Sequence, residues 1–561
     1  MSTVAMGQEE SSLGNTSEFV SKSQYDALLK QNEDLKRQLF EMKASSGAKY
    51  PAELINGRRA LECPVGVMTD SYKATHFQMY PEALSMTAYG EFRAQYKDVP
   101  CDDDRFVFYG IRHCIENIVN RPWTVADVEA AEQFYNTHNV AFTPYPFPKD
   151  LFLKFIAEND GYFPVQIQAL PEGTVAYVRT PCFVITAEGE YSRLCTFLET
   201  VLDMVWYPSC VATLSRFVRD VVEDAFNKSV DEEAFFLVDS RLHDFGFRGC
   251  TCIEQSVLGG AAHLLNFGGS DTMSACYHVQ HHLNEGRPVG TSIPATEHSV
   301  MTAWKDEEAA MTNEIAMYGH SLYACVMDSY DYDNALNVVL PAVAEQVKAK
   351  GGTIVLRPDS GDPLTQVLKG LRAAEKTFGV TTNNKGFKCL QNSAVIQGDG
   401  VNYESVKEIL AGVMDAGYAA SNVAFGMGGG LLQKMNRDTM SFATKLSHIV
   451  DMDGTHRDVM KTPKTSSAKI SLPGRLFVGR QGGVPLVYPA EAEECAGMEP
   501  VLKVVYDKRP VPGAFDDFDT VRNRVKEQWA ALPAKGTVLS AKLQQKIDRV
   551  LAERQYEAEA V

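Results

Sequence analysis

A repeated order of apolar strand, polar or glycine-rich loop, and helix runs from residue 192 to about residue 437, and it constrains the fold more than any other feature of this chain. Each of four strand candidates stops at a charged residue or a glycine; they are residues 322–327, 353–356, 395–397 and 423–425. Strands that alternate with helices form parallel sheets, so the fold class is α/β and the segment predicts an irregular βα barrel. Barrels of this kind carry their functional groups at the carboxyl ends of the strands, where we expect the site.

Glycines follow the last two of these strands, at Gly398 and at Gly428 to Gly430. The final loops of a barrel often bind phosphate, and a helix N-terminus supplies N–H donors to it. Residues 430–480 carry nine Lys or Arg against four Asp, although the whole chain has a net charge of −18. The sequence therefore predicts a polyphosphate site here. The alternatives are ordinary glycine turns and a solvated basic face.

Composition excludes several classes of protein. The acidic net charge of −18 argues against nucleic acid and anionic membranes as partners, and no apolar run is long enough to span a bilayer. The polar N-terminus lacks the features of a signal peptide, which predicts a cytoplasmic protein.

The 561 residues of the chain predict at least two domains. We expect an α+β domain at 51–191, mostly β and joined by part of 440–515, then the barrel at 192–439, and a basic and helical region at 440–561.

The first 50 residues form a separate N-terminal extension. Apolar residues and one Asn recur there at steps of three and four residues: Tyr25, Leu28, Asn32, Leu35, Leu39 and Met42. This stripe predicts a short helix of the coiled-coil type, in which a buried Asn fixes the register. An amphipathic helix that packs on its own domain is the alternative, because three heptads are too few to hold a dimer.

The cysteines are scattered, and we interpret them as reduced thiols. The one close pair, Cys250 and Cys252, has a single residue between its members. Zinc loops usually separate their cysteines by two or more residues, so a metal or redox site at this pair is the less favoured alternative.

Several segments, in order, match one family. Residues 67–474 resemble the nicotinamide phosphoribosyltransferases, type II phosphoribosyltransferases of NAD salvage, through TDSYKATH at 69–76, WYP at 206–208, HDFGFRG at 243–249, GSDT at 269–272, PATEHS at 294–299, DSYD at 328–331, RPDSG at 357–361, QGDG at 397–400 and FGMGGGLLQK at 425–434. The resemblance implies an irregular α/β barrel beside a smaller, mostly β domain. It also implies a homodimer whose active sites lie between the subunits, and transfer of phosphoribosyl from phosphoribosyl pyrophosphate to nicotinamide.

The resemblance assigns the nicotinamide ring to two aromatic side chains, Phe245 of one subunit and Tyr72 of the other. Asp271 matches the residue that faces the carboxamide, where a carboxylate accepts from the amide and repels nicotinic acid. Arg248 matches a contact to the ring or the nucleotide phosphate. The alternative for Asp271 is a structural role as the N-cap of the next helix.

The family's ribose and phosphate contacts match Arg357, Asp359 and Asp399, beside Gly398, Gly428 and Gly429. Mg²⁺ is the implied cofactor, bound mostly through the diphosphate, with Asp328 and Asp359 as candidate ligands because Mg²⁺ combines phosphate oxygens with one or two carboxylates. Salt bridges between loops are the alternative role for these carboxylates.

His298 matches a histidine that ATP phosphorylates in the family, which makes ATP a coupled co-substrate. Asp328 is then expected to orient this imidazole, so that His298, Asp328 and Asp359 form the catalytic set. Basic residues that hold phosphates, some of them across the dimer, match Arg437, Lys445 and Lys469.

Two positions depart from the family pattern: Ala324 and Ala443 stand where close relatives can carry Ser.

Two other functions of the chain stay open at this point. Nicotinate phosphoribosyltransferase shares the reaction but disfavours an acidic residue at Asp271. A non-catalytic scaffold that uses residues 25–42 would not need His298, Asp271, Asp359 and Asp399 together.

Overall fold

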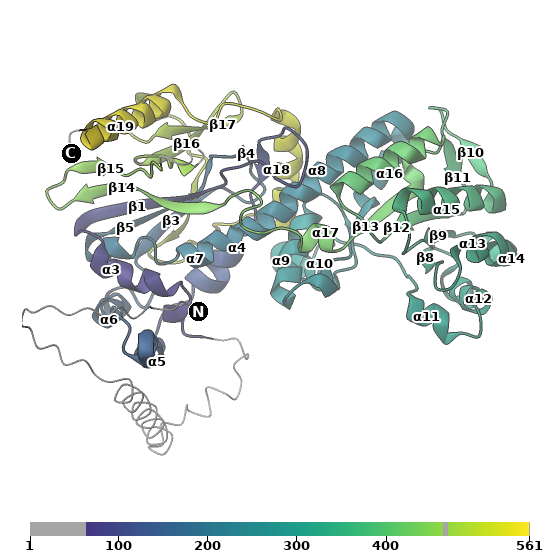
Figure 1. Cartoon of the computed structure of the whole chain (residues 1–561), viewed down its shortest axis with the longest axis horizontal. Helices are drawn as coiled ribbons and strands as arrows, with labels where there is room; N and C mark the ends of the chain where they lie inside the picture. Colours follow the sequence, from purple (N-terminus) through teal and green to yellow (C-terminus); the bar gives the residue numbers. More distant parts are fainter. Residues whose placement is uncertain (1–62, 464–468, 560–561) are drawn as a thin grey trace, which may run out of the picture. The chain divides into compact units, whose positions relative to one another are not determined.

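A computed structural model describes residues 63–463 and 469–559 of the chain. Within it, Pro64–Val561 form one compact unit, which Figure 1 shows in colour. The predicted N-terminal helix at residues 1–50 lies outside the described residues. The domain boundaries at 191 and 439 stay a prediction.

The first half of the chain builds an antiparallel sheet with strands that return from the C-terminal region. Its order is β15 (His456–Asp458), β14 (Ala443–Asp451), β1 (Ala83–Glu91), β5 (Pro181–Glu188), β3 (Val165–Ala169) and β18 (Lys503–Asp507). In β1 and β14, Met86 pairs with Ile449 and Tyr89 pairs with Lys445. In the left half of Figure 1 the purple β1 and the light-green β14 lie side by side. Strands more than 350 positions apart in the sequence therefore share one sheet.

The predicted strands form a parallel sheet. Its order is β7 (Gly269–Ser270), β6 (Leu242–Asp244), β13 (Val423–Met427), β12 (Ser393–Gln397), β9 (Thr353–Arg357) and β8 (Leu322–Val326). The segment at residues 291–296 connects its two edges, because Thr291 bridges to Gly269 and Ala295 bridges to Ala324. The sheet thus curls into an irregular barrel, and the predicted α/β fold class is confirmed.

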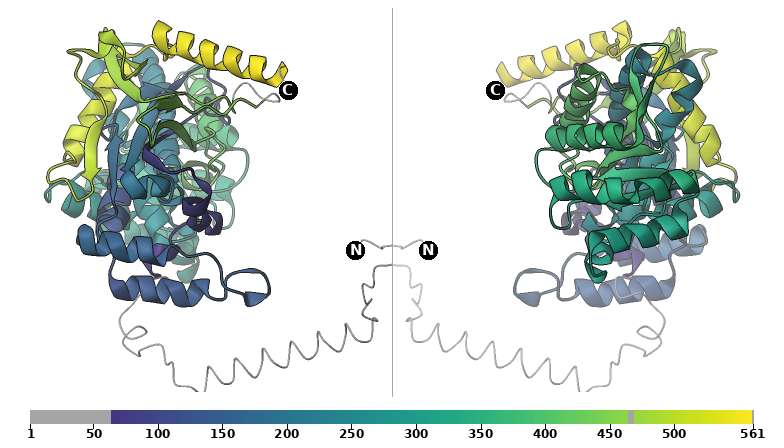
Figure 2. Two further views of the ribbon diagram at one scale, coloured as in Figure 1. Left: turned by 90° about the vertical axis from the view of Figure 1, so that its left-hand side faces the viewer. Right: turned by 90° about the vertical axis from the view of Figure 1, so that its right-hand side faces the viewer.

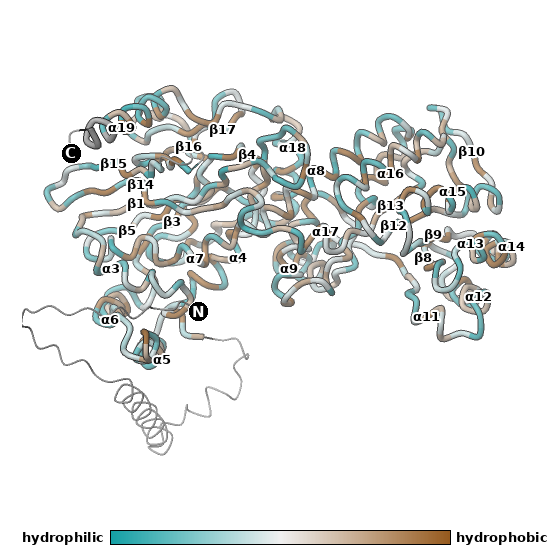
Figure 3. The backbone as a smooth tube through the Cα atoms, in the orientation of Figure 1, coloured by the Kyte–Doolittle hydropathy of each residue, from teal (hydrophilic) through white to brown (hydrophobic). Residues whose placement is uncertain are grey.

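Burial explains why these segments become strands. The middle of β9 is buried at three consecutive residues, as a strand covered on both faces must be, while β3 alternates between buried and partly exposed residues. Ala324, Val355 and Ile396 point into the barrel, where Phe245 packs against them. Figure 3 shows hydrophobic, brown segments along the strands of both sheets.

Helices enclose the barrel. Four of them contact one another in succession, and the green and teal helices of the right-hand view in Figure 2 show this layer: α12 (Glu307–Tyr318), α14 (Leu340–Lys350), α15 (Pro363–Phe378) and α16 (Tyr403–Asp415). Short polar side chains fix where they begin. Asp362 caps α15 by accepting from Thr365 N at 2.9 Å, and Asn402 caps α16 by accepting from Ser405 N at 3.0 Å. The strand-to-helix loops are thereby held in place.

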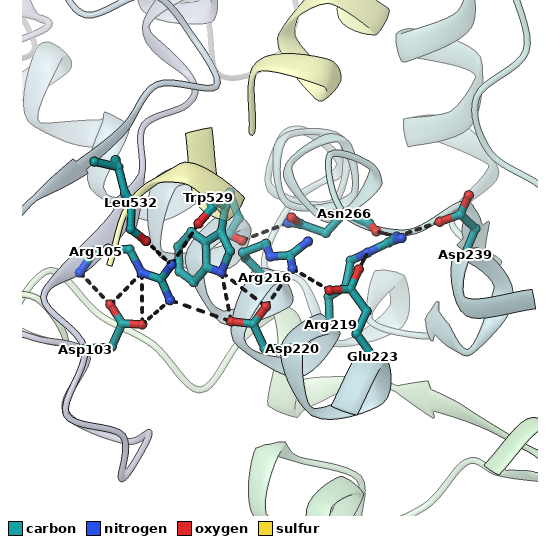
Figure 4. A network of polar contacts seen from close by, with 11 residues as sticks. Asp103, Arg105, Arg216, Arg219, Asp220, Glu223, Asp239, Asn266, Trp529 and Leu532 are labelled. Atoms are coloured by element: carbon teal, nitrogen blue, oxygen red, sulfur yellow. Dashed lines mark hydrogen bonds and ion pairs between the residues drawn. The ribbon is translucent and has the colours of Figure 1, made fainter. Parts of the chain in front are cut away.

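A polar network fixes α18 (Phe518–Ala531) against the long helix α8 (Trp206–Ser229) (Figure 4). The indole N–H of Trp529 donates to Asp220 at 2.8 Å, and the Arg105 guanidinium lies 3.9 Å from the Trp529 ring centroid. Arg105 also forms an ion pair with Asp103 at 2.6 Å. Helix α8 contacts β2 (Arg105–Val107), a strand of a separate two-stranded sheet, and also the barrel helices α9 (Ile253–Leu264) and α16, so this network anchors a helix that packs on both parts of the chain.

Two further findings concern the described part of the chain. None of its helices combines the length and the apolar character that a membrane crossing requires. All the cysteines lie in this part, and none is paired in a disulfide.

Candidate active site

A cavity of about 900 Å³ opens at the carboxyl ends of the parallel strands. Residues after β6, β9, β12 and β13 form its wall, together with the start of the segment after β7. Nine of the residues proposed for the site from the sequence line it: Phe245, Arg248, Asp271, Arg357, Asp359, Gly398, Asp399, Gly428 and Gly429. The barrel therefore brings residues from five separate loops into one cavity.

The Phe245 ring packs directly against the neighbouring strand, and it fits there because that strand has a glycine, without a side chain, opposite the ring. A Cβ atom at Gly426 would lie 1.9 Å from the Phe245 ring, and one at Gly398 would lie 3.4 Å from it. The Phe245 N–H donates to Met427 O at 3.0 Å, which fixes the loop on β13. The aromatic ring can therefore lie close against the strand ends and present a face to the cavity.

Asp271 is held by its neighbours and is not a helix cap. Its N–H donates to Asp244 O at 3.0 Å, and its Oδ1 accepts from the Ser292 hydroxyl at 2.6 Å. The next helix, α10 (Met273–His278), has Thr272 as N-cap without any side-chain capping bond. The structural alternative proposed for Asp271 is therefore wrong, and its carboxylate faces the cavity.

The other end of the cavity is formed by the glycine loop. A Cβ atom at Gly430 would lie 2.6 Å from Val401 O, so a side chain does not fit there. The short helix α17 (Gly429–Leu432) starts in this loop, and the first N–H groups of a helix have no partner within the helix. Lys434 also lines the cavity. These donors and this cation suit phosphate oxygens.

The imidazole of His298, at the start of α11 (His298–Ala303), lies beside the carboxylates of Asp328 and Asp359. Its Nε2 lies 3.4 Å from Asp359 Oδ2 and 4.0 Å from Asp328 Oδ1, and its Nδ1 lies 3.1 Å from the Ser329 hydroxyl. Asp328 Oδ2 accepts from Asp359 N at 3.0 Å and from the Ser360 hydroxyl at 2.5 Å. The three residues predicted as the catalytic set thus lie together, with Asp359 closest to the imidazole.

The carboxylates partly fit the expected Mg²⁺. Among the described residues, no three His, Cys, Asp or Glu side chains are arranged to hold a metal ion. Asp328 Oδ1 is nevertheless buried without a hydrogen-bond partner, and Asp359 stands beside it with an exposed carboxylate edge. Two such carboxylates can complete a Mg²⁺ site in which diphosphate supplies most ligands.

Tyr72, Arg437, Lys445 and Lys469 do not line this cavity. Tyr72, in the turn Ser71–Thr75, is 54% exposed, and Arg437 and Lys469 are exposed as well. Lys445 lies on β14, where burial and the charge of Arg93 lower its pKa. Their expected roles at this site, and the subunit that supplies them, stay predictions.

Sequence reasoning missed several residues of the site. Asp244 could have been found, because it is the last residue of β6 and belongs to the quoted HDFGFRG segment; burial raises its pKa to about 6. Gln433 and Lys434 belong to a motif already noted, yet neither was assigned a contact. Ser329 likewise belongs to the quoted DSYD segment but was assigned no contact, whereas Ser292 lies in an irregular segment outside any quoted motif or periodic pattern.

Comparison with solved structures defines the class of fold. The crystal structure of human nicotinic acid phosphoribosyltransferase covers 86% of this chain and 99% of its own, at 18% identity and a TM-score of 0.56. That of nicotinate-nucleotide pyrophosphorylase from Pyrococcus furiosus covers 84% and 97%, at 16% identity and 0.54. The chain therefore has the fold of the nicotinate phosphoribosyltransferases.

Sequence comparison then gives the family. Residues 240–507 match the model of the nicotinate phosphoribosyltransferase family, and residues 64–167 match the N-terminal domain of nicotinamide phosphoribosyltransferase. A nicotinamide phosphoribosyltransferase of Xanthomonas campestris is 40% identical over 422 residues, which are 73% of this chain and 86% of the relative. One of Acinetobacter baylyi is 30% identical over 73% and 87%. The chain belongs to the nicotinamide phosphoribosyltransferase family and is an enzyme.

Proposed function

We propose that this enzyme joins nicotinamide to phosphoribosyl pyrophosphate, giving nicotinamide mononucleotide and diphosphate. One observation carries the choice of substrate: the Asp271 carboxylate, held by Ser292 at 2.6 Å, faces the same cavity as Phe245. A flat apolar ring packs on the aromatic face, and an amide donates to the carboxylate. The carboxylate of nicotinic acid would be repelled there, and a mismatch of this kind gives large discrimination.

The transfer needs the ribose to be fixed while its anomeric carbon loses diphosphate. The pyridine nitrogen forms the new bond to this carbon, the bond from carbon to the diphosphate oxygen breaks, and the electron pair leaves with the diphosphate. Asp359 and Asp399 line the same cavity as Arg357 and Arg248, and the two carboxylates would accept from the ribose hydroxyls. Fixed carboxylates stabilise the positive charge that develops on the ribose ring.

The diphosphate carries most of the substrate's charge. The glycine loop and Lys434 would hold the phosphate of the nucleotide, and Asp328 and Asp359 would hold Mg²⁺ through the diphosphate. When bound, Mg²⁺ supplies charge neutralisation to the leaving group.

ATP coupling would act through His298. The terminal phosphoryl group of ATP transfers to an imidazole nitrogen, and ADP leaves. Asp359 and Asp328, at 3.4 and 4.0 Å from Nε2, orient the ring and stabilise its positive charge. The phosphohistidine stands next to the diphosphate side of the site, so its charge can affect how the substrate and the product bind.

A homodimer would complete the site. Tyr72, Arg437, Lys445 and Lys469 are expected from the partner. Exposed apolar side chains occur on the elements that follow β6 and β7, and they would suit a subunit interface: Phe247, which lines the cavity, Ile253, Met273 and Tyr277. The cytoplasm is the proposed compartment, in keeping with the unpaired cysteines.

The test is product analysis by mass with phosphoribosyl pyrophosphate, Mg²⁺ and equimolar nicotinamide and nicotinic acid, with and without ATP. We expect nicotinamide mononucleotide, in a yield that rises with ATP. The variant His298→Ala should keep part of the transferase activity and lose the ATP effect, and Asp271→Asn should accept more nicotinic acid. Nicotinic acid mononucleotide as the main wild-type product would overturn the proposed role of Asp271.

If no product forms, the scaffold alternative gains support, and removal of residues 1–50 tests it further. A scaffold that uses these residues loses its partner when they are removed, whereas an enzyme keeps its turnover. If ATP still stimulates the His298→Ala variant fully, the proposed phosphorylation of His298 is wrong.

A further inference from the structure

A separate cavity, of about 320 Å³, lies between helices that belong to the two parts of the chain. Its walls come from α4 (Ile111–Cys114) and the turn after it on one side, and from α9 and α10 of the barrel on the other. No described residue lines both this cavity and the active-site cavity. Its volume is at the lower end of the range of small-molecule sites, about 300–1,000 Å³. We call it the interhelical cavity.

Two residues that line the interhelical cavity are buried and carry polar atoms without a partner. Tyr109 is 3% exposed, and its hydroxyl has no hydrogen-bond partner among the described residues. Glu172 Oε1 accepts from Gly110 N at 2.8 Å and from Arg112 N at 3.0 Å, whereas its Oε2 has no hydrogen bond there, although the residue is only 8% exposed. The two groups are close, since burial and then the charge of Glu172 raise the pKa of Tyr109. Buried polar atoms normally have partners, so these two free oxygens point to a ligand.

Two histidines line the barrel side of the interhelical cavity. His278 ends α10, and His282 lies one turn further along, with 5.2 Å between the two ring centroids. Among the described residues, neither ring has a hydrogen bond or an ion pair. Burial and the charges of His282, His113 and Arg112 lower the pKa of His278 to about 4. The His278 imidazole is therefore neutral near pH 7 and offers one nitrogen as an acceptor.

The charges around the interhelical cavity favour a cation. The Arg112 guanidinium is already engaged, because its Nε donates to Glu116 at 3.0 Å and its NH1 donates to Asp516 O at 3.3 Å. The Glu172 carboxyl has no cation beside its free oxygen, and burial raises its pKa. A cation at Oε2 would stabilise the ionised carboxylate, whereas an anion would be repelled there.

We infer that the interhelical cavity binds a primary aliphatic amine through its ammonium group. An ammonium has three N–H donors, and the cavity offers three acceptors: Glu172 Oε2, the Tyr109 hydroxyl oxygen and a ring nitrogen of His278. A metal ion suits the cavity less well, because no three His, Cys, Asp or Glu side chains of the described chain are arranged to hold one. The alkyl chain of the amine packs on apolar side chains of the wall: Leu258, Ala261 and Leu283.

The inference does not depend on the proposed reaction, and binding of n-butylamine to the full chain tests it, followed by ligand-detected NMR titration at neutral pH. Glu172→Gln should weaken binding about tenfold or more, the loss typical of a hydrogen bond between charged groups, while its amide oxygen still accepts from both backbone N–H groups. Tyr109→Phe should weaken binding about fivefold and leave the Tm unchanged, because its hydroxyl has no partner in the described chain. The control Glu129→Gln, exposed on α5 (Val125–Tyr135) and outside the cavity, should bind like the wild type.

Other ligands make the result specific. n-Butanol has the same chain without the charge, and tetramethylammonium has the charge without an N–H donor, so both should bind about tenfold more weakly or less. The inference is wrong if the wild type does not bind n-butylamine, if n-butanol binds equally well, or if both cavity variants keep the wild-type affinity. Displacement of n-butylamine by nicotinamide would place the amine in the active-site cavity, and binding of Zn²⁺ without binding of n-butylamine would indicate a histidine metal site. Either result also overturns the inference.

Discussion

At the scale of single residues, the site depends on side chains that hold the substrate-facing groups in place. Asp271 is partly exposed and would be free to rotate without the Ser292 hydroxyl, which binds its Oδ1 at 2.6 Å. His243 Nδ1 lies farther from the same oxygen, at 3.6 Å. Ser292 is therefore the main polar contact that fixes the carboxylate that is proposed to face the nicotinamide amide.

Replacing Ser292 tests this positioning role. Ser292→Ala should raise the KM for nicotinamide about fivefold, because one hydrogen bond to a partly exposed carboxylate contributes about 1 kcal/mol. The kcat should change little, since the serine does not touch the reacting atoms, and Ser292→Thr should restore the KM. Steady-state kinetics with both variants give the answer. A fall in kcat with an unchanged KM would show that Ser292 acts elsewhere.

A buried carboxyl group behind β8 makes the free energy of unfolding depend on pH. Glu314 of α12 is 5% exposed, and neither of its carboxylate oxygens has a hydrogen-bond partner. Burial raises its pKa to about 7, and the Cys325 thiol and the charge of Arg357 lower this pKa by less than burial raises it. The folded protein thus holds this proton between pH 4.5 and 7, where the unfolded chain releases it. Its contribution to stability therefore falls as the pH rises through this range.

The variant Glu314→Gln removes that ionisation. It should stabilise the protein at pH 8, where keeping the carboxylate buried costs about 3 kcal/mol, and should have little effect at pH 5. Thermal unfolding at the two pH values measures this, with the exposed Glu308→Gln of the same helix as control. An equal change of Tm at both pH values would show that the carboxyl does not titrate as described.

At the scale of elements, the parallel strands could be predicted and the antiparallel partners could not. The predicted strands at 322–327, 353–356, 395–397 and 423–425 all exist, with ends that differ by one or two residues. Short apolar runs that end in charge or glycine are a local signal, so the sequence displays them. The pairing of β1 with β14 joins residues far apart along the chain, and no local pattern carries that information. The closing segment at 291–296 was missed for the same reason, because it contributes only single bridges.

The anchoring of α18 on α8 can be tested at Trp529. Trp529→Phe keeps the apolar ring but cannot donate to Asp220, and it weakens the stacking of Arg105. The expected loss is about 1–2 kcal/mol in the free energy of unfolding, seen as a lower Tm. The exposed Glu527→Gln on the same helix serves as control, and kcat/KM should not change in either variant. An unchanged Tm for Trp529→Phe would show that this network contributes nothing to stability.

At the scale of the whole molecule, the candidate site divides into two groups. Residues at the strand ends of the barrel were predicted together and lie together, because a parallel sheet brings its carboxyl ends to one edge. Tyr72, Arg437, Lys445 and Lys469 were expected at the same site, yet none lines the cavity of its own chain. The family resemblance assigns Tyr72 to the other subunit and some of the basic residues to a position across the dimer, and a single chain does not test that assignment.

Subunit mixing decides where Tyr72 acts. In the proposed homodimer, Tyr72→Ala removes the proposed second aromatic face and Asp271→Ala removes the proposed amide contact, so each homodimer of a single variant should have little activity. In a two-fold dimer with shared sites, half of the randomly mixed dimers carry both variants, and each of these has one intact site, which gives about a quarter of the wild-type activity. Co-expression with two different affinity tags isolates the mixed dimers and doubles that fraction. If Tyr72 instead served the cavity of its own chain, both sites of the mixed dimer would carry one defect, and no activity would return.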